Sequence, residues 1–440
     1  MGDRLGKFVA CGFKNDSHLP GRPLLIMLRP YRYRRCNLSG ENLLNKPNIT
    51  DVLIVGAGPA GLAAALACLE VGLSTTVADT SRSASSDAAK GRSAALLNNT
   101  VAFLQRLGVW TSCASAAEPL RVLQFIDDTG RRLRAPDCVF HAQEIGETAF
   151  GYNIANEDLM RAFKAEAERR AVRVVSPGAL ESLCAGPGNV CATFQDGAEF
   201  QAELIIAADG RMSAAREAAG IRTLKWSYNQ IAVATSLSHE RDHNGVCIEL
   251  HRAAGPFTLV PLPGKRSSLV WVERHSEADR LLALDDAAFA AEVEKISHLA
   301  LGRVMELSER ARFPLSSLAV REYGRSRVAL VGEAAHVTPP IGAQGLNLGF
   351  RDVEALAGLL ASARERGADI GGDDVLREYS AARRGDVVSR TLGVDILNRS
   401  LLSGLLPMQA ARGLGLYALG TIGPLRRAFM RRGIAPSGLV

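Results

Sequence analysis

The stretch DVLIVGAGPAGLAAALACLEVGLSTTVAD, residues 51–79, decides the fold expected for this chain. It begins with an apolar and β-branched run at residues 51–55, which is typical of a parallel strand covered on both faces. An alanine-rich segment follows, and a second short apolar run ends at Asp79. The stretch therefore predicts a strand, a tight turn, a helix and a second strand, which together form a dinucleotide-binding unit.

The turn carries three glycines, Gly56, Gly58 and Gly61, at the G-x-G-x-x-G spacing. The first glycine allows the tight turn, the second lets the backbone approach a pyrophosphate, and the third lets the helix pack closely on the strand. Free amide groups at the start of that helix would face the phosphates. A glycine motif alone is weak in a chain with 42 glycines, and a purely structural turn is the alternative.

Asp79 strengthens the dinucleotide interpretation because it lies 23 residues after Gly56, at the end of the second strand. An acidic side chain at this place accepts hydrogen bonds from the adenosine ribose hydroxyls. The same carboxylate disfavours a phosphate on that ribose. The expected ligand is therefore FAD or NAD rather than NADP.

Length and charge limit the other possibilities. The 440 residues, 47% hydrophobic and 22% charged, suit a globular protein with two joined domains and an appendage. The net charge of +6 lies in the ends, since residues 1–48 hold nine Lys and Arg against three acids and residues 411–440 hold five Arg and no acid. No nucleic-acid partner is therefore expected for the body of the chain.

The eight cysteines are scattered without a C-x-x-C pair, so no metal site is expected.

Residues 1–48 show no sustained amphipathic period and are expected to form a basic, disordered extension. Met27 would serve as a later start under the simplest interpretation. An organelle-targeting arm and a tether to anionic membranes are the alternatives. The apolar run LLIML is too short for a secretory signal.

Arg92 follows a serine-rich loop at residues 81–90. Leu96, Leu97, Val101, Leu104 and Leu107 recur at helical spacing, which predicts that Arg92 lies just ahead of a packed helix. One loop beyond the dinucleotide unit, this arginine is expected to contact a pyrophosphate or flavin, with a surface ion pair as the alternative.

The middle of the chain predicts a second sheet. Residues 119–151 and 222–318 contain short apolar runs separated by turn residues, and no helical pattern emerges in the second segment until about Ala283. A mostly antiparallel sheet beside a nucleotide domain would form one wall of a substrate chamber. Between these segments, a helix is expected at residues 157–171 and strands at residues 172–175 and 204–207.

Two further turns are expected at the ends of buried strands. The strand at residues 204–207 leads into Asp209 and Gly210, with Arg216 on the helix that follows. The stretch at residues 327–360 predicts a strand that ends at Glu333, a loop containing prolines and glycines, and a helix that Gly345 opens. A carboxylate and a set of helix amides would then converge on one ligand, and the amides would stabilise an anionic flavin.

Three motifs occur in order: GAGPAG at 56–61, ADG at 208–210, and GEAAHVTPPIGAQGLNLGFRD at 332–352. Through these three motifs, and over about residues 50–435, the chain resembles the flavoprotein aromatic hydroxylases of the para-hydroxybenzoate hydroxylase fold. Among them it is most similar to the ubiquinone-biosynthesis monooxygenases. The resemblance implies an α/β fold with three parts. These are an FAD-binding Rossmann-like domain (49–118, 152–221 and 319–385), a mostly antiparallel substrate domain (119–151 and 222–318) and a C-terminal helical region (386–440).

The resemblance also implies roles for particular residues. Arg92 would contact FAD, Asp209 would lie where flavin and nicotinamide binding overlap, and residues 345–347 would adjoin the isoalloxazine ring. Glu333 departs from the family, which has aspartate there, but it still presents a carboxylate to a ribityl hydroxyl. His336 is as consistent with a structural role as with a general base, so no catalytic residue is assigned. The expected cofactor-binding residues are Gly56, Gly58, Pro59, Ala60, Gly61, Asp79, Arg92, Asp209, Gly210, Gly332, Glu333, Pro340, Gly342, Gly345, Leu346 and Asn347.

The activity that the resemblance implies is FAD-dependent monooxygenation of the aromatic ring of a polyprenylated phenol in ubiquinone biosynthesis. NAD(P)H would reduce FAD transiently, and O2 would then form a flavin hydroperoxide that transfers one hydroxyl group. Three alternatives remain: a flavin-dependent reductase, a hydroxylase for another hydrophobic or aromatic substrate, and a non-catalytic flavoprotein scaffold that binds other quinone-biosynthesis proteins. A halogenase is disfavoured because the three tryptophans stand alone in the sequence.

The tail from Ile396 combines apolar segments with arginines. Pro407 and Arg412 interrupt the apolar character, so no membrane-spanning helix is expected. The tail would either cap the flavin domain or rest on an anionic membrane through four arginines that have no acid nearby in the sequence: Arg426, Arg427, Arg431 and Arg432. The expected localisation is cytoplasmic, with peripheral attachment to the inner membrane as the alternative.

Overall fold

The computed structural model describes residues 48–80, 91–130, 134, 136–340, 342–402 and 406–431. All of them belong to one compact unit, residues 32–440. The extension expected at residues 1–48 lies outside the described residues except for Asn48, which begins the first strand.

The predicted strand-turn-helix-strand unit is present at the start of the described chain. Strand β1 (Asn48–Val55) leads into helix α1 (Pro59–Glu70), and β2 (Thr75–Ala78) pairs with β1 in parallel. Residues 52–55 are completely buried, which explains why every one of them is apolar. The small alanines of α1 are also buried, so the helix lies close against the sheet.

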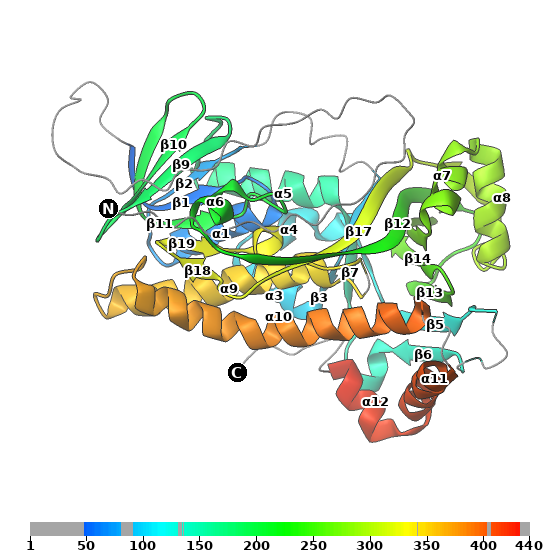
Figure 1. Cartoon of the computed structure of the whole chain (residues 1–440). Coiled ribbons are helices and arrows are strands. Elements are labelled where there is room, and N and C mark those ends of the chain that lie inside the picture. Colours follow the sequence, from blue (N-terminus) through cyan, green and yellow to red (C-terminus); the bar gives the residue numbers. More distant parts are fainter. Residues whose placement is uncertain are drawn as a thin grey trace, which may run out of the picture. The chain divides into compact units, whose positions relative to one another are not determined.

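The two strands of this unit belong to an eight-stranded sheet (Figure 1). Strands β19, β11, β1, β2 and β8 lie side by side in parallel, and β18, β9 and β10 add antiparallel pairs. Because the five central strands are parallel, their carboxyl ends meet at one edge of the sheet. The strands not yet bounded are β8 (Arg173–Val175), β9 (Leu180–Ala185), β10 (Val190–Phe194), β11 (Glu199–Ala207), β18 (Gly324–Arg325) and β19 (Val328–Leu330).

A nine-stranded sheet forms the second layer, and the prediction of a mostly antiparallel second sheet is confirmed. Its neighbours run β20-β17-β12-β15-β14-β13-β5-β6, with β16 beside β12, and only the β13–β5 pair is parallel among the described strands. The strands are β5 (Val122–Asp127), β6 (Cys138–His141), β12 (Thr223–His239), β13 (Val246–Arg252), β14 (Gly255–Leu262), β15 (Arg266–Glu273), β16 (Val304–Leu307), β17 (Ala311–Val320) and β20 (His336–Val337).

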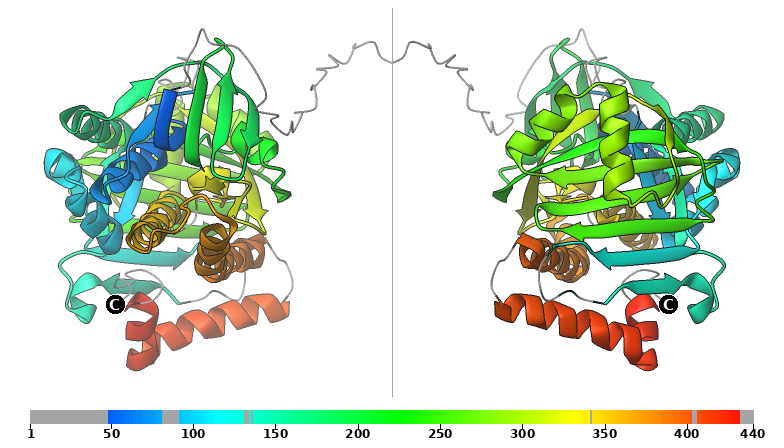
Figure 2. Two further views of the ribbon diagram at one scale, coloured as in Figure 1. Left: turned by 90° about the vertical axis from the view of Figure 1, so that its left-hand side faces the viewer. Right: turned by 90° about the vertical axis from the view of Figure 1, so that its right-hand side faces the viewer.

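The two faces of the nine-stranded sheet differ. Helices α7 (His275–Ala283) and α8 (Asp286–Ile296) cover one face, as the right-hand view of Figure 2 shows. The other face carries a smaller apolar cluster of Trp226, Tyr228, Ala232, Val270, Val272, Phe313 and Leu315. The prediction that helix begins only at about Ala283 is wrong, because α7 begins at His275. Helix α7 has nine residues and begins with polar side chains, and only Ala278 and Leu281 are buried.

A three-stranded sheet of β3 (Ser93–Leu97), β7 (Gly151–Ala155) and β4 (Ala117–Pro119) follows the loop at residues 81–90. The prediction that Leu96 and Leu97 begin a helix is wrong, because both lie in β3 and pair with β7. The pairing is close: a Cβ atom on Gly151 would lie 2.1 Å from the carbonyl oxygen of Leu96. Arg92 therefore precedes a strand, and the helix α3 starts only at Asn98.

The remaining elements are helices, and the last of them form the C-terminal region (Figure 1). The long helix α10 contacts α9 and also reaches β18 and β14. It runs through residue 386, where the sequence placed the start of the C-terminal region. These elements are α3 (Asn98–Arg106), α4 (Trp110–Cys113), η1 (Ala114–Ala116), η2 (Ala142–Ile145), α5 (Asn156–Arg169), α6 (Ala214–Ala218), η3 (Gly332–Ala334), α9 (Gln344–Glu365), α10 (Asp373–Leu402), α11 (Leu406–Thr421) and α12 (Gly423–Phe429).

Helix α12 packs against β6 and the turn that follows it. Met430 is fully buried with Phe140, and the guanidinium of Arg426 lies 4.4 Å from the centre of the Phe140 ring. Arg426 also donates two hydrogen bonds to Glu144, at 2.5 and 2.7 Å, which lower the pKa of that carboxyl to about 2. No acid lies near Arg426 in the sequence, but the fold brings the distant Glu144 to it, so Arg426 is paired within the chain. Within the described residues, no helix is both long and apolar enough to span a bilayer.

The contact between Gly61 and the β1 turn gives a test of the fold. A Cβ atom on Gly61 would lie 1.9 Å from the carbonyl oxygen of Gly56, which is backbone and has little room to move. We expect Gly61→Ala to lower the free energy of unfolding by about 3 kcal/mol, which outweighs the roughly 1 kcal/mol that alanine gains in a helix. Urea unfolding of the protein without bound cofactor measures this loss, so that ligand binding does not contribute. The control is Gly58→Ala, whose Cβ meets no atom within 4 Å. Equal midpoints for the two variants would contradict the close contact.

Candidate functional site

Four predicted site residues follow neighbouring parallel strands of the eight-stranded sheet. Gly56 follows β1, Asp79 follows β2, Asp209 lies two residues after β11, and Gly332 lies two residues after β19. These strands are adjacent in the order β19-β11-β1-β2, so the four residues lie along one edge. Ligands of open α/β sheets bind outside the carboxyl ends of such strands.

The three glycines of the first turn have different structural roles. Gly56 has φ of +106°, and a Cβ atom there would lie 2.5 Å from the carbonyl oxygen of Ala208. Gly61 has no room for a Cβ atom either, whereas a Cβ atom on Gly58 would meet nothing within 4 Å. No side chain caps the N-terminus of α1, which begins at Pro59. The fold thus requires Gly56 and Gly61, while Gly58 leaves open space before uncapped helix amides, which fits a pyrophosphate.

Asp209 lies beside the glycine turn, since the amide of Ala208 donates to the carbonyl oxygen of Val55 at 2.8 Å. Its Oδ2 atom accepts a hydrogen bond from the amide of Ala215 at 3.1 Å. Its Oδ1 atom is buried and has no hydrogen-bond partner among the described residues. Burial raises the pKa of this carboxyl. A buried acceptor without a donor fits a bound group that brings its own O–H or N–H.

Arg216, which the sequence placed on the following helix without a role, joins two of the turns. Its side chain is completely buried, with 1% of the residue surface exposed. Its Nη1 atom donates to the carbonyl oxygen of Ala334 at 2.8 Å, and its Nη2 atom donates to that of Arg211 at 3.0 Å. The turn after β11 and the turn η3 after β19 are therefore held together.

Arg92 and Glu333 come together where the two large sheets meet. The guanidinium of Arg92 lies 4.5 Å from the centre of the Phe313 ring, on the face of the nine-stranded sheet opposite α7 and α8. Partial burial lowers the pKa of Arg92, the Glu333 carboxylate opposes this shift, and Arg211 adds to it. Arg211 in turn donates to Ser316 on β17 at 3.2 Å. The residues predicted to contact the flavin and the ribityl chain are thus electrostatic neighbours.

The side chain of Asn347 forms hydrogen bonds with the protein backbone. Its Nδ2 atom donates to the carbonyl oxygens of Ala95 at 2.8 Å and Ala343 at 2.6 Å, and its Oδ1 atom accepts from the amide of Leu97 at 2.9 Å. A contact from Asn347 to a cofactor would therefore use its backbone. The side chain instead fixes β3, and with it the position of Arg92, against the start of α9.

The loop before α9 leads directly into the N-terminus of that helix, which no side chain caps. Gly342 has φ of +65° and Ala343 has φ of +54°, and no side chain caps α9. Pro340 is exposed, and residue 341 between these positions lies outside the described residues. Gly345, in the first turn of α9, has open space where a Cβ atom would lie. The first turn of α9, which includes Gly345 and Leu346, thus offers free backbone amides to an anionic or electron-rich ring.

His336 is buried beside a buried carboxylate. It is 2% exposed, and its Nε2 atom lies 2.6 Å from Oδ2 of Asp352, which is completely buried. The sequence motifs alone give no role to Asp352 or to its second partner, Arg383. A signal was present, because Asp352 lies four residues after Leu348 and four before Leu356, on the buried face of α9. A carboxylate among buried leucines requires partners.

These observations fit a bound FAD: two uncapped helix N-termini, open space at Gly58, and an unpaired buried oxygen of Asp209. A family profile described as "FAD binding domain" matches residues 49–392. The ubiquinone hydroxylase UbiL of Rhodospirillum rubrum is 36% identical over 386 residues, which cover 87% of this chain and 89% of that protein. The chain belongs to the FAD-dependent ubiquinone hydroxylase family.

Two further comparisons agree with this membership. The 3-demethoxyubiquinol 3-hydroxylase of Escherichia coli is 31% identical over 394 residues, covering 88% of this chain and 99% of that protein. The crystal structure of p-nitrophenol 4-monooxygenase PnpA from Pseudomonas putida superposes with a TM-score of 0.71 at 20% identity, covering 88% of this chain and 98% of that one. This structural likeness shows the fold. The predicted fold class, FAD cofactor and monooxygenase class are confirmed, while the individual FAD contacts stay predictions.

Gly58 allows a sharp test of the FAD site. We expect Gly58→Val to fold normally, since open space surrounds the added side chain, and to lose FAD, because the side chain would occupy the space of the pyrophosphate. The flavin-to-protein absorbance ratio after gel filtration measures retention, and urea unfolding of the apoprotein checks the fold. Full FAD occupancy in a folded Gly58→Val protein would show that the pyrophosphate lies elsewhere.

Proposed function

We propose that this protein hydroxylates the aromatic ring of a polyprenylated phenol, a precursor of ubiquinone, with FAD bound along the edge defined above. The relatives support the reaction, since their names are those of ubiquinone hydroxylases. The observation that carries the proposal in this chain is the apolar sheet face beside Arg92. It places aromatic and aliphatic side chains against the predicted flavin contacts.

The sheet face suits a flat, apolar ring. Phe313 contacts Arg92, and Trp226 and Val270 are only partly buried, so their apolar surfaces remain available. A polar group adjoins this surface: Tyr228 accepts from the indole of Trp226 at 2.8 Å and donates to Asp395 of α10 at 2.6 Å. An apolar pocket with a few fixed polar groups is the usual form of a small-molecule site.

The chain's own residues would bind, orient and exclude water. Gly58 and the first turn of α1 would hold the pyrophosphate, and Asp79 would accept from the ribose. Arg92 and Glu333 would hold the flavin end, and the sheet face would keep water from the reacting ring. FAD supplies the redox and oxygen chemistry, and NAD(P)H and O2 are the proposed co-substrates. The sequence carries one dinucleotide fingerprint, which fits a nicotinamide donor that visits the flavin transiently.

The direct test is turnover by the FAD-loaded protein with NAD(P)H, a polyprenylated phenol and isotopically labelled O2. We expect one labelled oxygen atom in the ring of the product and one NAD(P)H consumed for each ring hydroxylated. Mass spectrometry of the product, with unlabelled O2 as the control, measures this. A reduced product formed without O2 would establish a reductase instead. FAD that stays bound but is not reduced by NAD(P)H, with no product formed, would indicate a non-catalytic scaffold.

We further propose that α11 and α12 rest on an anionic membrane, where a polyprenylated substrate resides. Five large apolar side chains on these helices and the link between them are 40–67% exposed: Leu414, Tyr417, Ile422, Leu425 and Phe429. Arg427 and Arg431 are exposed beside them. Apolar side chains flanked by basic residues suit the interface of a lipid bilayer. Arg426, paired with Glu144, holds α12 on β6 and would orient this surface.

Vesicle binding tests this surface. We expect the intact protein to co-sediment with vesicles of anionic lipid at low salt and less at high salt, because each basic residue near the surface contributes about 1 kcal/mol. Changing Arg427 and Arg431 together to Gln should weaken binding at least about tenfold, while a matched Arg366→Gln and Arg377→Gln variant, remote from α12 in sequence, should bind normally. Unchanged, salt-insensitive binding in the first variant would leave α11 and α12 as a structural cap.

A further inference from the structure

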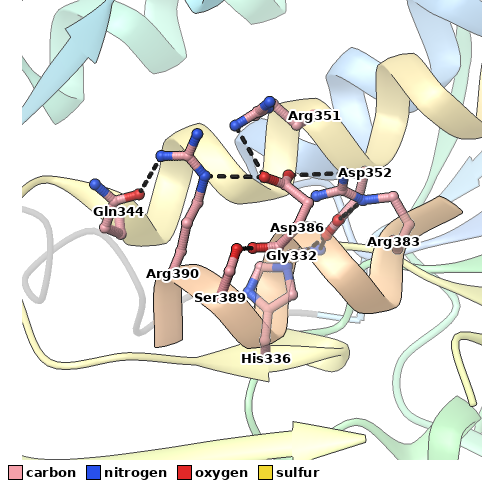
Figure 3. Close-up of polar contacts among 9 residues, drawn as sticks. All are labelled: Gly332, His336, Gln344, Arg351, Asp352, Arg383, Asp386, Ser389 and Arg390. Atoms are coloured by element: carbon pink, nitrogen blue, oxygen red, sulfur yellow. Dashed lines mark hydrogen bonds and ion pairs between the residues drawn. The ribbon is translucent and has the colours of Figure 1, made fainter. Parts of the chain in front are cut away.

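A completely buried carboxylate connects the predicted flavin-contact turn to two helices (Figure 3). Oδ2 of Asp352, on α9, accepts a hydrogen bond from the amide of Gly332 at 2.9 Å and lies 2.6 Å from Nε2 of His336. Oδ1 of Asp352 accepts from Nε of Arg383, on α10, at 2.7 Å. Asp352 has no exposed surface, and Arg383 has 4%. Gly332 begins the turn η3, whose next residue is Glu333.

The position of Gly332 is confined on other sides as well. A Cβ atom on Gly349 of α9 would lie 3.1 Å from the Cα atom of Gly332, and one on Gly332 would lie 3.3 Å from the Cβ atom of Ala60 in α1. Gly332 also has φ of +61°, which only glycine adopts readily. The turn therefore lies between α9 and α1. The hydrogen bond from the Gly332 amide to Asp352 fixes how far this turn extends toward the proposed FAD site.

A second chain of contacts runs from Arg383 to the start of α9. Nη1 of Arg383 donates to Asp386 at 3.0 Å, and the other carboxylate oxygen of Asp386 accepts from Nε of Arg390 at 2.9 Å. Nη1 of Arg390 then donates to the side chain of Gln344, the first residue of α9, at 3.3 Å. Arg351 pairs with Asp386 at 3.2 Å. Both protein segments predicted to contact the flavin, η3 and the first turn of α9, are thus tied to α10.

The charge of Asp352 is maintained despite its burial. Burial alone would raise the pKa of this carboxyl, but the interactions with His336 and Arg383 outweigh it, and the pKa lies below its usual range. Removing one partner from such a buried group leaves an unpaired charge or polar atom, which is costly.

We propose that Asp352 is a positioning residue for FAD, which sets the Gly332–Ala334 turn and couples it to α10 through Arg383. The proposal rests on the FAD placement proposed above, because it needs Glu333 and its turn to contact the cofactor. Asp352 itself, buried behind the turn, acts through Gly332 and His336 and has no direct contact with the reacting atoms.

The variant Asp352→Asn removes the negative charge of this side chain and keeps its shape nearly unchanged. An amide has one acceptor oxygen, whereas the present carboxylate uses one oxygen for Gly332 and His336 and the other for Arg383. Whichever way the amide is turned, its NH2 group faces a donor, either the Gly332 amide or the Arg383 guanidinium. One of the two connections is therefore lost while the volume stays nearly the same.

The experiment measures the FAD dissociation constant, the flavin reduction potential and the urea unfolding midpoint of the apoprotein for four proteins. These are the native chain, Asp352→Asn, Glu333→Ala as a test of the turn itself, and Asp374→Asn as a control. Asp374 lies on the same helix as Arg383 in an exposed pair with Arg377, with 87% of its side chain accessible. We expect Asp352→Asn to weaken FAD binding at least about tenfold and to shift the reduction potential, because a displaced turn changes the flavin surroundings.

The outcomes separate the proposal from the function on which it rests. Weaker binding in Asp352→Asn and Glu333→Ala, with Asp374→Asn unchanged, supports the proposal. Weaker binding in Glu333→Ala alone overturns it and leaves the FAD site intact. Normal binding in both would contradict the placement of FAD at this turn. A lower unfolding midpoint in Asp352→Asn, with native FAD affinity and reduction potential, would show a purely structural role and also overturn the proposal.

Discussion

The close contact of backbone on backbone at the end of β1 is the constraint on which the site depends. Gly61 packs against the carbonyl group of Gly56, and Gly56 packs against the carbonyl group of Ala208. Neither glycine has room for a Cβ atom. These contacts bring α1, β1 and the turn after β11 together. A similar contact between Gly349 and Gly332 brings α9 against the turn after β19. Of the three glycines of the first turn, only Gly58 leaves open space for a Cβ atom, and it lies at the uncapped start of α1.

Buried polar groups then connect this edge to the rest of the molecule. Arg216 joins the turns after β11 and β19, Asn347 joins β3 to α9, and Asp352 joins α9, the turn η3 and α10. Helix α10 also accepts a hydrogen bond from Tyr228 on the nine-stranded sheet, through Asp395. Helix α10 therefore contacts both α9 and the nine-stranded sheet. These contacts link the proposed position of the cofactor to the proposed wall of the substrate chamber through α10.

The sequence predicts well what depends on neighbouring residues. The unit at residues 51–79, the antiparallel character of the second sheet and the helix after Gly345 follow from local periodicity and turn residues, and the structure agrees. Leu96 and Leu97 were wrongly given to a helix because their spacing suits either state, and pairing with the distant β7 decides. The acid that pairs with Arg426 was missed for the same reason, since Glu144 is 282 residues away. The roles of Asn347 and Asp352 likewise depend on partners that sequence spacing does not reveal.

The most direct test of the account is a crystal structure of the protein with bound FAD. We expect electron density for the pyrophosphate beside Gly58 at the start of α1, and for the isoalloxazine ring between the first turn of α9 and the sheet face that carries Phe313. We also expect the Glu333 carboxylate to lie within hydrogen-bond distance of a ribityl hydroxyl. FAD bound with its pyrophosphate away from α1, or with its ring remote from Glu333 and α9, would contradict the central claim.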